Sequence, residues 1–146
     1  MSTQAEKTMQ VLIVEPGKAA YVAEIDGSLT DMQKVVNGYI QATYPYEEPV
    51  ALICNEDGIF EGLPFNRALR DGNGEIYDIV VGTFFICGLS GSNFTSLSLE
   101  HMEKFKEMFY DPEIFTRIGN RIIAIKVTEE YLRRNPPPKR GSPEHT

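Results

Sequence analysis

The alternation of apolar runs and turn residues divides the chain into short strands and two longer helical stretches. Runs rich in β-branched and aromatic residues predict strands at residues 10–15, 21–25, 39–43, 49–54, 75–89 and 121–127. Apolar residues at helical spacing predict a helix from Ser28 to Gly38 and a second helix from Ser98 to Tyr110. Ser28 and Ser98 are suitable N-cap residues, so both helices have a defined start.

Two shorter stretches also carry helix-start residues. Pro64 can occupy a first helical turn, which predicts a short helix from Leu63 to Leu69. Asp111-Pro112 predicts another short turn of helix, ending near Phe115. Gly82 interrupts the longest strand signal, and we expect a bulge there or a close approach by other backbone or a ligand.

The order of elements is strand, strand, helix, strand, strand, short helix, strand, helix, strand. This order predicts one α+β domain over residues 9–128, with a mixed or mostly antiparallel sheet and the two main helices on one side. Residues 49–54 are almost continuously apolar, so that strand should be central and covered on both faces. Residues 133–146 are basic and rich in proline, and we expect them to form a disordered tail.

The predicted core combines strand residues with the apolar stripe of each helix. Its members are Val11, Ile13, Met32, Val36, Leu52, Ile53, Ile79, Val81, Phe85, Met102, Phe105, Phe109, Ile123 and Ile125.

Charge is unevenly distributed along the chain. The formal net charge is −7, yet residues 133–146 hold four basic residues against one acid, a net +3 that leaves −10 for the rest. An acidic body disfavours binding to the phosphate backbone of a nucleic acid. It either keeps the protein soluble or forms an acidic surface that binds a basic protein face or imitates DNA.

The sequence indicates a cytoplasmic protein. No apolar run approaches the length of about 18 residues that a membrane span needs, and the first residues do not resemble a signal peptide. Cys54 and Cys87 each follow an apolar strand run, as small buried hydrophobes do in a reducing compartment. Neither a disulfide nor a zinc site is predicted from them.

Catalytic and cofactor signatures are absent from the sequence, and we predict no catalytic residue, no cofactor and no metal site. Neither histidine, His101 or His145, has a credible serine or cysteine partner in the sequence, and no glycine pattern fits a phosphate loop. Acidic pairs such as Glu47-Glu48 could hold Mg²⁺ or act as acid and base, although adjacent loop acids are usually solvated.

Two arginines are the most interesting cations. Arg67 and Arg70 lie three residues apart on the predicted short helix and would share a face. Guanidinium groups bind phosphate or carboxylate oxygens in pairs, and aromatic rings, Phe65 among them, can stack on a base. The predicted ligand site for a small nucleotide-type anion comprises Tyr44, Tyr46, Asn66, Arg67, Arg70 and Tyr77.

The same arginines have an alternative role. They can pair with nearby carboxylates and fasten the loop without any ligand. The candidate partners are Glu56, Asp57, Asp71 and Asp78.

Several strings of the chain resemble a known but uncharacterised domain family. The strings are VEPGK from Val14, GYIQATYPYEEPVALICNEDG from Gly38, GLPFNRAL from Gly62 and IYDIVVGTFF from Ile76. The family occurs in phages, prophages and conjugative elements of Gram-positive bacteria. It has no established activity, so the resemblance implies context only: a small cytoplasmic protein of a mobile element, of a kind that often antagonises host defence.

Three functions are therefore open. The first is a non-catalytic binder that sequesters a small nucleotide-type signal, and the second is an acidic inhibitor or DNA mimic that acts on a host defence protein. The third is an enzyme that uses carboxylates and a metal. The predicted partners are a small anionic ligand or a host defence protein, with neither nucleic acid nor membrane, and a homo-oligomer is possible.

Overall fold

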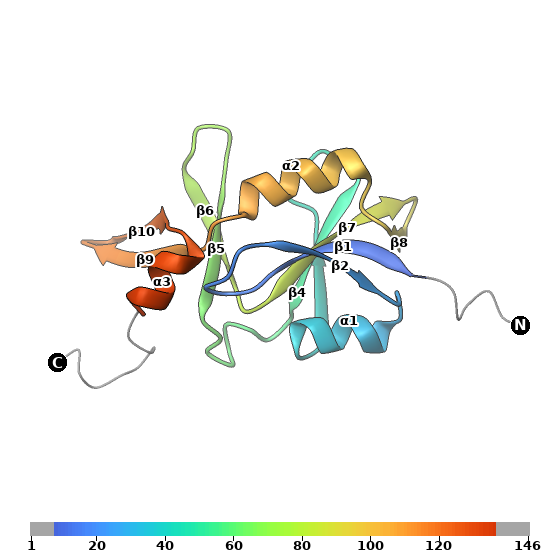
Figure 1. The fold of residues 1–146 in the computed structure, drawn as a ribbon, viewed down its shortest axis with the longest axis horizontal. Coiled ribbons are helices and arrows are strands. Elements are labelled where there is room, and N and C mark those ends of the chain that lie inside the picture. Colours follow the sequence, from blue (N-terminus) through green and yellow to red (C-terminus); the bar gives the residue numbers. More distant parts are fainter. Residues whose placement is uncertain (1–7, 137–146) are drawn as a thin grey trace, which may run out of the picture.

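A computed structural model describes residues 8–136, and an antiparallel sheet forms its centre (Figure 1). Five strands follow the order β2-β1-β7-β4-β3, and β8 adds to β7. Every pair in this sheet is antiparallel. The strand bounds are β1 Met9–Val14, β2 Tyr21–Ile25, β3 Ile40–Thr43, β4 Val50–Asn55, β7 Phe84–Ser90 and β8 Asn93–Thr95.

The two main helices cover opposite faces of this sheet. Helix α1 (Leu29–Val36) packs Met32 and Val36 against Val11 and Ile53. Helix α2 (Leu99–Phe109) covers the other face, where its apolar stripe meets the alternate residues of the same strands. The two helices run above and below the strands in Figure 1.

The prediction that both helices lie on one side is therefore wrong. Strands β1 and β4 are apolar at consecutive positions, and consecutive side chains of a strand point to opposite faces. Such strands need cover on both faces. The expectation that residues 49–54 form a central strand is confirmed, because β4 lies between β7 and β3.

Both helix starts follow the sequence prediction. The Ser28 hydroxyl accepts a hydrogen bond from the Asp31 amide, and the Ser98 hydroxyl accepts one from the His101 amide. Helix α1 ends at Val36, and its C-cap is Asn37, one residue before the predicted Gly38; Asn37 adopts a left-handed conformation with φ 61°.

The segment between the sheet strands forms a separate hairpin of β5 (Phe65–Arg70) and β6 (Ile76–Val81). The predicted short helix at residues 63–69 is wrong, since this segment pairs along its length with β6 and the pairing overrides its weak helix signals. The predicted single strand at residues 75–89 divides at Gly82, which has φ 74°. A Cβ built on Gly82 would lie 2.6 Å from Leu63 Cδ1, so the predicted close approach is made by a side chain of the protein itself.

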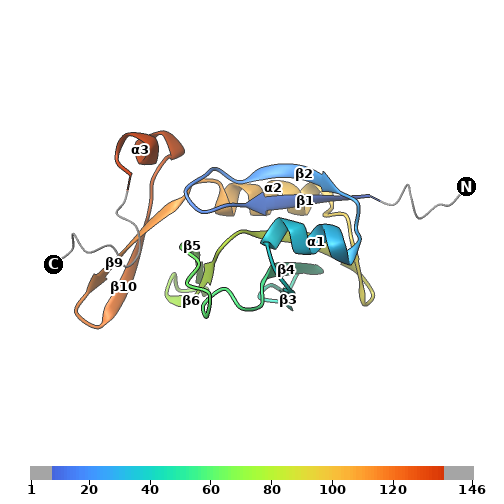
Figure 2. The same cartoon turned by 90° about the horizontal axis from the view of Figure 1, so that it is seen from below.

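The C-terminal part of the described chain forms a second hairpin and a short helix. Strands β9 (Glu113–Ile118) and β10 (Arg121–Lys126) pair with each other, and α3 (Glu129–Arg134) follows. The view in Figure 2 shows this hairpin beside the β5–β6 hairpin, at the end of the molecule. The predicted helical turn after Pro112 is wrong. Residues 133 and 134, assigned to the tail, form the end of α3, whereas residues 137–146 lie outside the described part.

The predicted core is largely correct. Val11, Leu52, Ile53 and Phe85 are at most 1% exposed, and the predicted residues of α1 and α2 are buried. Three predicted core residues of the hairpins depart from this: Ile79 and Ile123 are only partly buried, and Ile125 is 47% exposed because β10 belongs to a hairpin and not to the sheet. The fold is broadly α+β with mostly antiparallel strands, and none of the described helices is long and apolar enough to cross a membrane.

Candidate functional site

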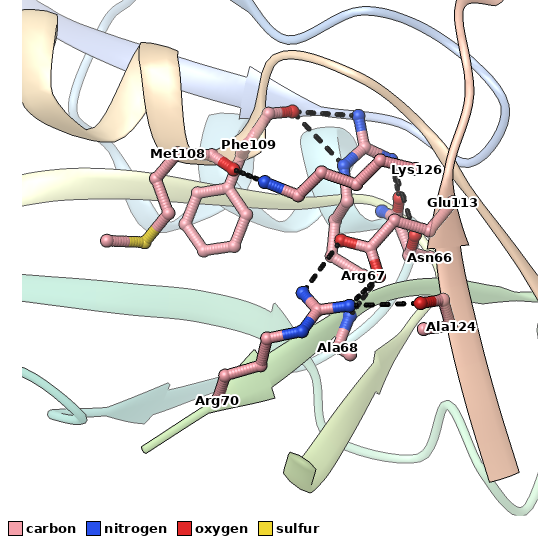
Figure 3. A network of polar contacts seen from close by, with 9 residues as sticks. All are labelled: Asn66, Arg67, Ala68, Arg70, Met108, Phe109, Glu113, Ala124 and Lys126. Carbon is pink, nitrogen blue, oxygen red and sulfur yellow. Dashed lines mark hydrogen bonds and ion pairs between the residues drawn. The ribbon is translucent and has the colours of Figure 1, made fainter. Parts of the chain in front are cut away.

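Asn66 and Arg67 are buried within β5 and do not line an open site. Arg67 is 0% exposed and Asn66 is 1% exposed. The five N–H groups of the Arg67 guanidinium make five hydrogen bonds: two to the Phe109 carbonyl (3.1 and 2.9 Å), one to the Lys18 carbonyl (2.7 Å) and two to Asn66 (2.7 and 3.3 Å). Figure 3 shows the bonds from Arg67 to Phe109 and Asn66. No donor of Arg67 is left for a ligand.

The surroundings of Arg67 explain how a buried cation is tolerated. Phe109 is the last residue of α2, and the carbonyl end of a helix attracts positive charge. Burial lowers the pKa of the Arg67 guanidinium to about 10, while Glu113 and Asp111 oppose that shift. The side chain is therefore charged at neutral pH, and it ties α2 and the β1–β2 turn to β5.

Arg70 is joined to the second hairpin. Its guanidinium pairs with the Glu113 carboxylate at 3.3 and 3.4 Å and donates to the Ala124 carbonyl at 3.3 Å. The Glu113 side chain is only 1% exposed and also accepts from the Ala68 amide. Arg70 therefore has the alternative role considered from the sequence, in which it pairs with a carboxylate of the chain. Its partner is Glu113, which was not among the four candidate acids.

The tyrosines do not converge on the arginines as a ligand pocket. Tyr46 packs its ring on Phe105, with centroids 4.8 Å apart, and burial raises the pKa of its hydroxyl. Tyr44 and Tyr77 are more than half exposed. The small hollow between Tyr46 and Arg70 has a volume of about 150 Å³, half the roughly 300 Å³ at which ligand sites begin.

A larger groove lies between β3–β4 and β6, and we call it the acidic groove. Its volume is about 470 Å³. Leu52, Leu69 and Val80 contribute buried apolar surface to its lining. The charged residues among its described lining are all acids: Glu56, Asp57 and Asp78.

The loop between β4 and β5 forms one wall of the acidic groove and displays two large apolar side chains. Ile59 is 77% exposed and Phe60 is 92% exposed. We call residues 55–64 the Ile59–Phe60 loop. Exposure of such a large apolar surface to water is unfavourable, and packing among residues 8–136 does not offset it.

The backbone of the Ile59–Phe60 loop is held by internal hydrogen bonds. The amides of residues 58, 61, 62 and 63 donate to carbonyls within the loop at 2.8–3.3 Å, and Asn55 Oδ1 accepts from the Asp57 amide. The glycine at position 58 packs closely on Val81, since a Cβ there would lie 2.7 Å from Val81 Cγ2. The loop therefore presents Ile59 and Phe60 in a fixed position.

Sequence reasoning missed Ile59 and Phe60. The available signal was two large apolar residues between Gly58 and Gly62, inside a stretch otherwise typical of turns. Apolar residues isolated in a loop have no strand or helix face to bury them, so their exposure could have been predicted.

Side chains of the metal-ligating types are also spread out. Within residues 8–136, no three of the His, Cys, Asp and Glu side chains gather in an arrangement that could hold a metal ion.

Comparison with known proteins identifies the family. The sequence profile of the domain of unknown function DUF3846 matches residues 9–110, which is more than half of the chain. The chain belongs to this family. No curated protein and no solved structure matches it. The matched part ends at the C-terminus of α2, so β9, β10 and α3 lie beyond it.

Proposed function

We propose that this protein is a non-catalytic binder of a partner protein, and that the acidic groove and the Ile59–Phe60 loop form its binding surface. The observation that carries the proposal is Phe60, a phenylalanine 92% exposed on an internally hydrogen-bonded loop beside three carboxylates. Aromatic anchors surrounded by polar residues dominate the affinity of protein interfaces.

The charge of the surface defines the chemistry of the partner. Glu56, Asp57 and Asp78 are exposed and none of them takes part in an ion pair between described residues. A segment that carries lysine or arginine together with a large apolar side chain complements them. An anionic nucleotide would be repelled here, so the geometry favours a protein partner over a nucleotide-type ligand.

The resemblance to mobile-element proteins adds a biological setting. On that basis the partner would be a host defence protein in the bacterial cytoplasm. This part of the proposal rests on the resemblance alone, and the chemistry of the acidic groove does not depend on it.

A peptide array tests the proposal directly. Binding of the wild-type protein to random twelve-residue peptides should enrich sequences that combine basic and large apolar residues. The Phe60→Ser variant should bind the selected peptides at least about tenfold more weakly, as expected for loss of an interface anchor. Asp57→Asn should weaken binding less and reduce its salt dependence.

Leu99→Ser is the matched control, because Leu99 is 78% exposed at the start of α2, away from the acidic groove. Its binding should be unchanged. Selection of acidic peptides, or equal binding by Phe60→Ser and wild type, would refute the proposed surface.

A further inference from the structure

A second groove lies at the junction between the family domain and the C-terminal segment, and we call it the junction groove. Its volume is about 480 Å³, within the range of about 300–1,000 Å³ typical of small-molecule sites. One side comes from the β1–β2 turn and the start of β5, and the other from β9, β10 and α3. Figure 1 shows these elements together at one end of the molecule.

The lining of the junction groove is mainly apolar. Phe65 and Phe115 meet edge to face, with ring centroids 5.3 Å apart. Pro16, Ile122 and Leu132 add further apolar surface. An apolar lining of this kind packs well against the hydrocarbon part of a ligand and offers few hydrogen bonds to a sugar or a phosphate chain.

The charged side chains in and beside the junction groove differ in whether they have a partner among the described residues. The Glu113 carboxylate is committed to Arg70 and to the Ala68 amide. Arg117 is exposed, and its guanidinium makes no hydrogen bond or ion pair with any other described residue. Beside the groove, Arg133 is matched by Glu129 at 3.3 Å, and Lys18 lies 3.9 Å from Glu15. The uncompensated charge on the described lining is therefore the guanidinium of Arg117.

We propose that the junction groove binds a linear aliphatic carboxylate, with the chain along Phe65, Phe115 and Ile122 and the carboxylate on Arg117. The hydrocarbon chain supplies the affinity by leaving water, and the guanidinium selects an anionic head group by a charge-assisted hydrogen bond. This site is separate from the acidic groove, so its test is independent of the proposed protein partner.

Calorimetric titration with hexanoate, octanoate and decanoate, each below its micelle concentration, tests the site on the full chain. Each added methylene should raise affinity about fourfold until the groove is full, from about 0.8 kcal/mol per buried methylene. The Arg117→Gln variant should bind decanoate at least about tenfold more weakly.

Arg121→Gln is the matched control. Arg121 pairs with Ile118, whereas Arg117 pairs with Ile122, so the two arginines lie on opposite faces of the same hairpin. It should bind decanoate like the wild type. Ile122→Trp should fill the groove and abolish binding; the chain has no other tryptophan, so its fluorescence reports the site directly.

Three results would overturn the proposal. Binding of decylamine as tight as that of decanoate would show that Arg117 does not select an anion. An equal loss in Arg117→Gln and Arg121→Gln would place the ligand elsewhere, and so would retained binding in Ile122→Trp. Both arginines are exposed, so these variants test the site without threatening the fold.

Discussion

The Ile59–Phe60 loop and strand β5 are adjacent in sequence, and each breaks the rule that apolar side chains are buried and charged ones exposed. They break it in opposite ways. The loop exposes Phe60 by 92%, whereas β5 buries Arg67 completely. Arg67 nonetheless has every donor satisfied, by Phe109, Lys18 and Asn66. Phe60 has an ordered backbone and almost no cover for its ring.

This difference separates structural from functional roles. A buried charge whose hydrogen bonds are all made within the chain holds elements together and has nothing left for a ligand. An exposed aromatic ring on a fixed loop has the opposite character, since its favourable contacts remain to be made. Arg67, one of the two cations that the sequence singled out, therefore has a structural role, and the less conspicuous apolar pair is the better candidate for recognition.

The strongest test of this comparison is Arg67→Ala. The change removes five hydrogen bonds and leaves two buried acceptors, the Phe109 carbonyl and Asn66 Oδ1, without that partner. Since each unsatisfied buried group costs about 1–3 kcal/mol, the free energy of unfolding should fall by at least about 3 kcal/mol. Denaturant titration measures it. A loss below about 0.5 kcal/mol would mean that Arg67 does not hold these elements together.

Leu52→Ala provides the apolar reference for that loss. Leu52 is 1% exposed in the central strand β4, so its truncation should cost about 2–5 kcal/mol. Leu99→Ala, at an exposed leucine, should change stability by less than about 0.5 kcal/mol. If Leu52→Ala were equally harmless, β4 would not be the centre of the sheet.

Phe60→Ser and Ile59→Ser should show the contrasting behaviour. Both side chains are mainly in water, so their removal should alter the free energy of unfolding by no more than about 0.5 kcal/mol. Thermal and denaturant melts should then match those of the wild type. A clear destabilisation of either variant would indicate that the loop packs on the body and would remove the main reason to regard it as a binding surface.

Strands β1 to β4 and both long helices could be predicted because local signals and tertiary packing agree there. Ser28 and Ser98 start the helices as expected, and the apolar run of β4 identified a central strand. At β5 the local signal and the packing disagree: Leu63-Pro64 suggests the start of a helix, but pairing with β6 decides the outcome. Propensity is a weak prior in such a short segment.

The roles of the predicted site residues depended on contacts distant in sequence. Arg70 meets Glu113 across 43 residues, and Arg67 reaches Phe109 across 42. Neither distance is visible in a spacing rule, so the arginines looked available for a ligand. The small-ligand prediction for these residues stays a prediction.

The accessibility of the acidic groove can be measured by comparing the reactivity of the two cysteines. Cys54 lines the groove and is partly exposed, whereas Cys87 is buried in β7. Burial, and then Asp78, raise the pKa of the Cys54 thiol; burial raises the pKa of Cys87 to about 12. A raised thiol pKa means less thiolate at a given pH, so alkylation of Cys54 should be slow at neutral pH and still accelerate above the usual thiol pKa of about 8.5.

Asp78→Asn gives the smallest effect and the sharpest check. Removal of one neighbouring negative charge, worth about 1 kcal/mol or less in a water-like environment, should speed alkylation of Cys54 by no more than about fivefold. Cys87 should react only after unfolding, in the wild type and the variant alike. Mass spectrometry of the alkylated protein separates the two sites. If Cys87 were labelled as fast as Cys54 in the native state, the contrast between an open groove and a closed core would be wrong.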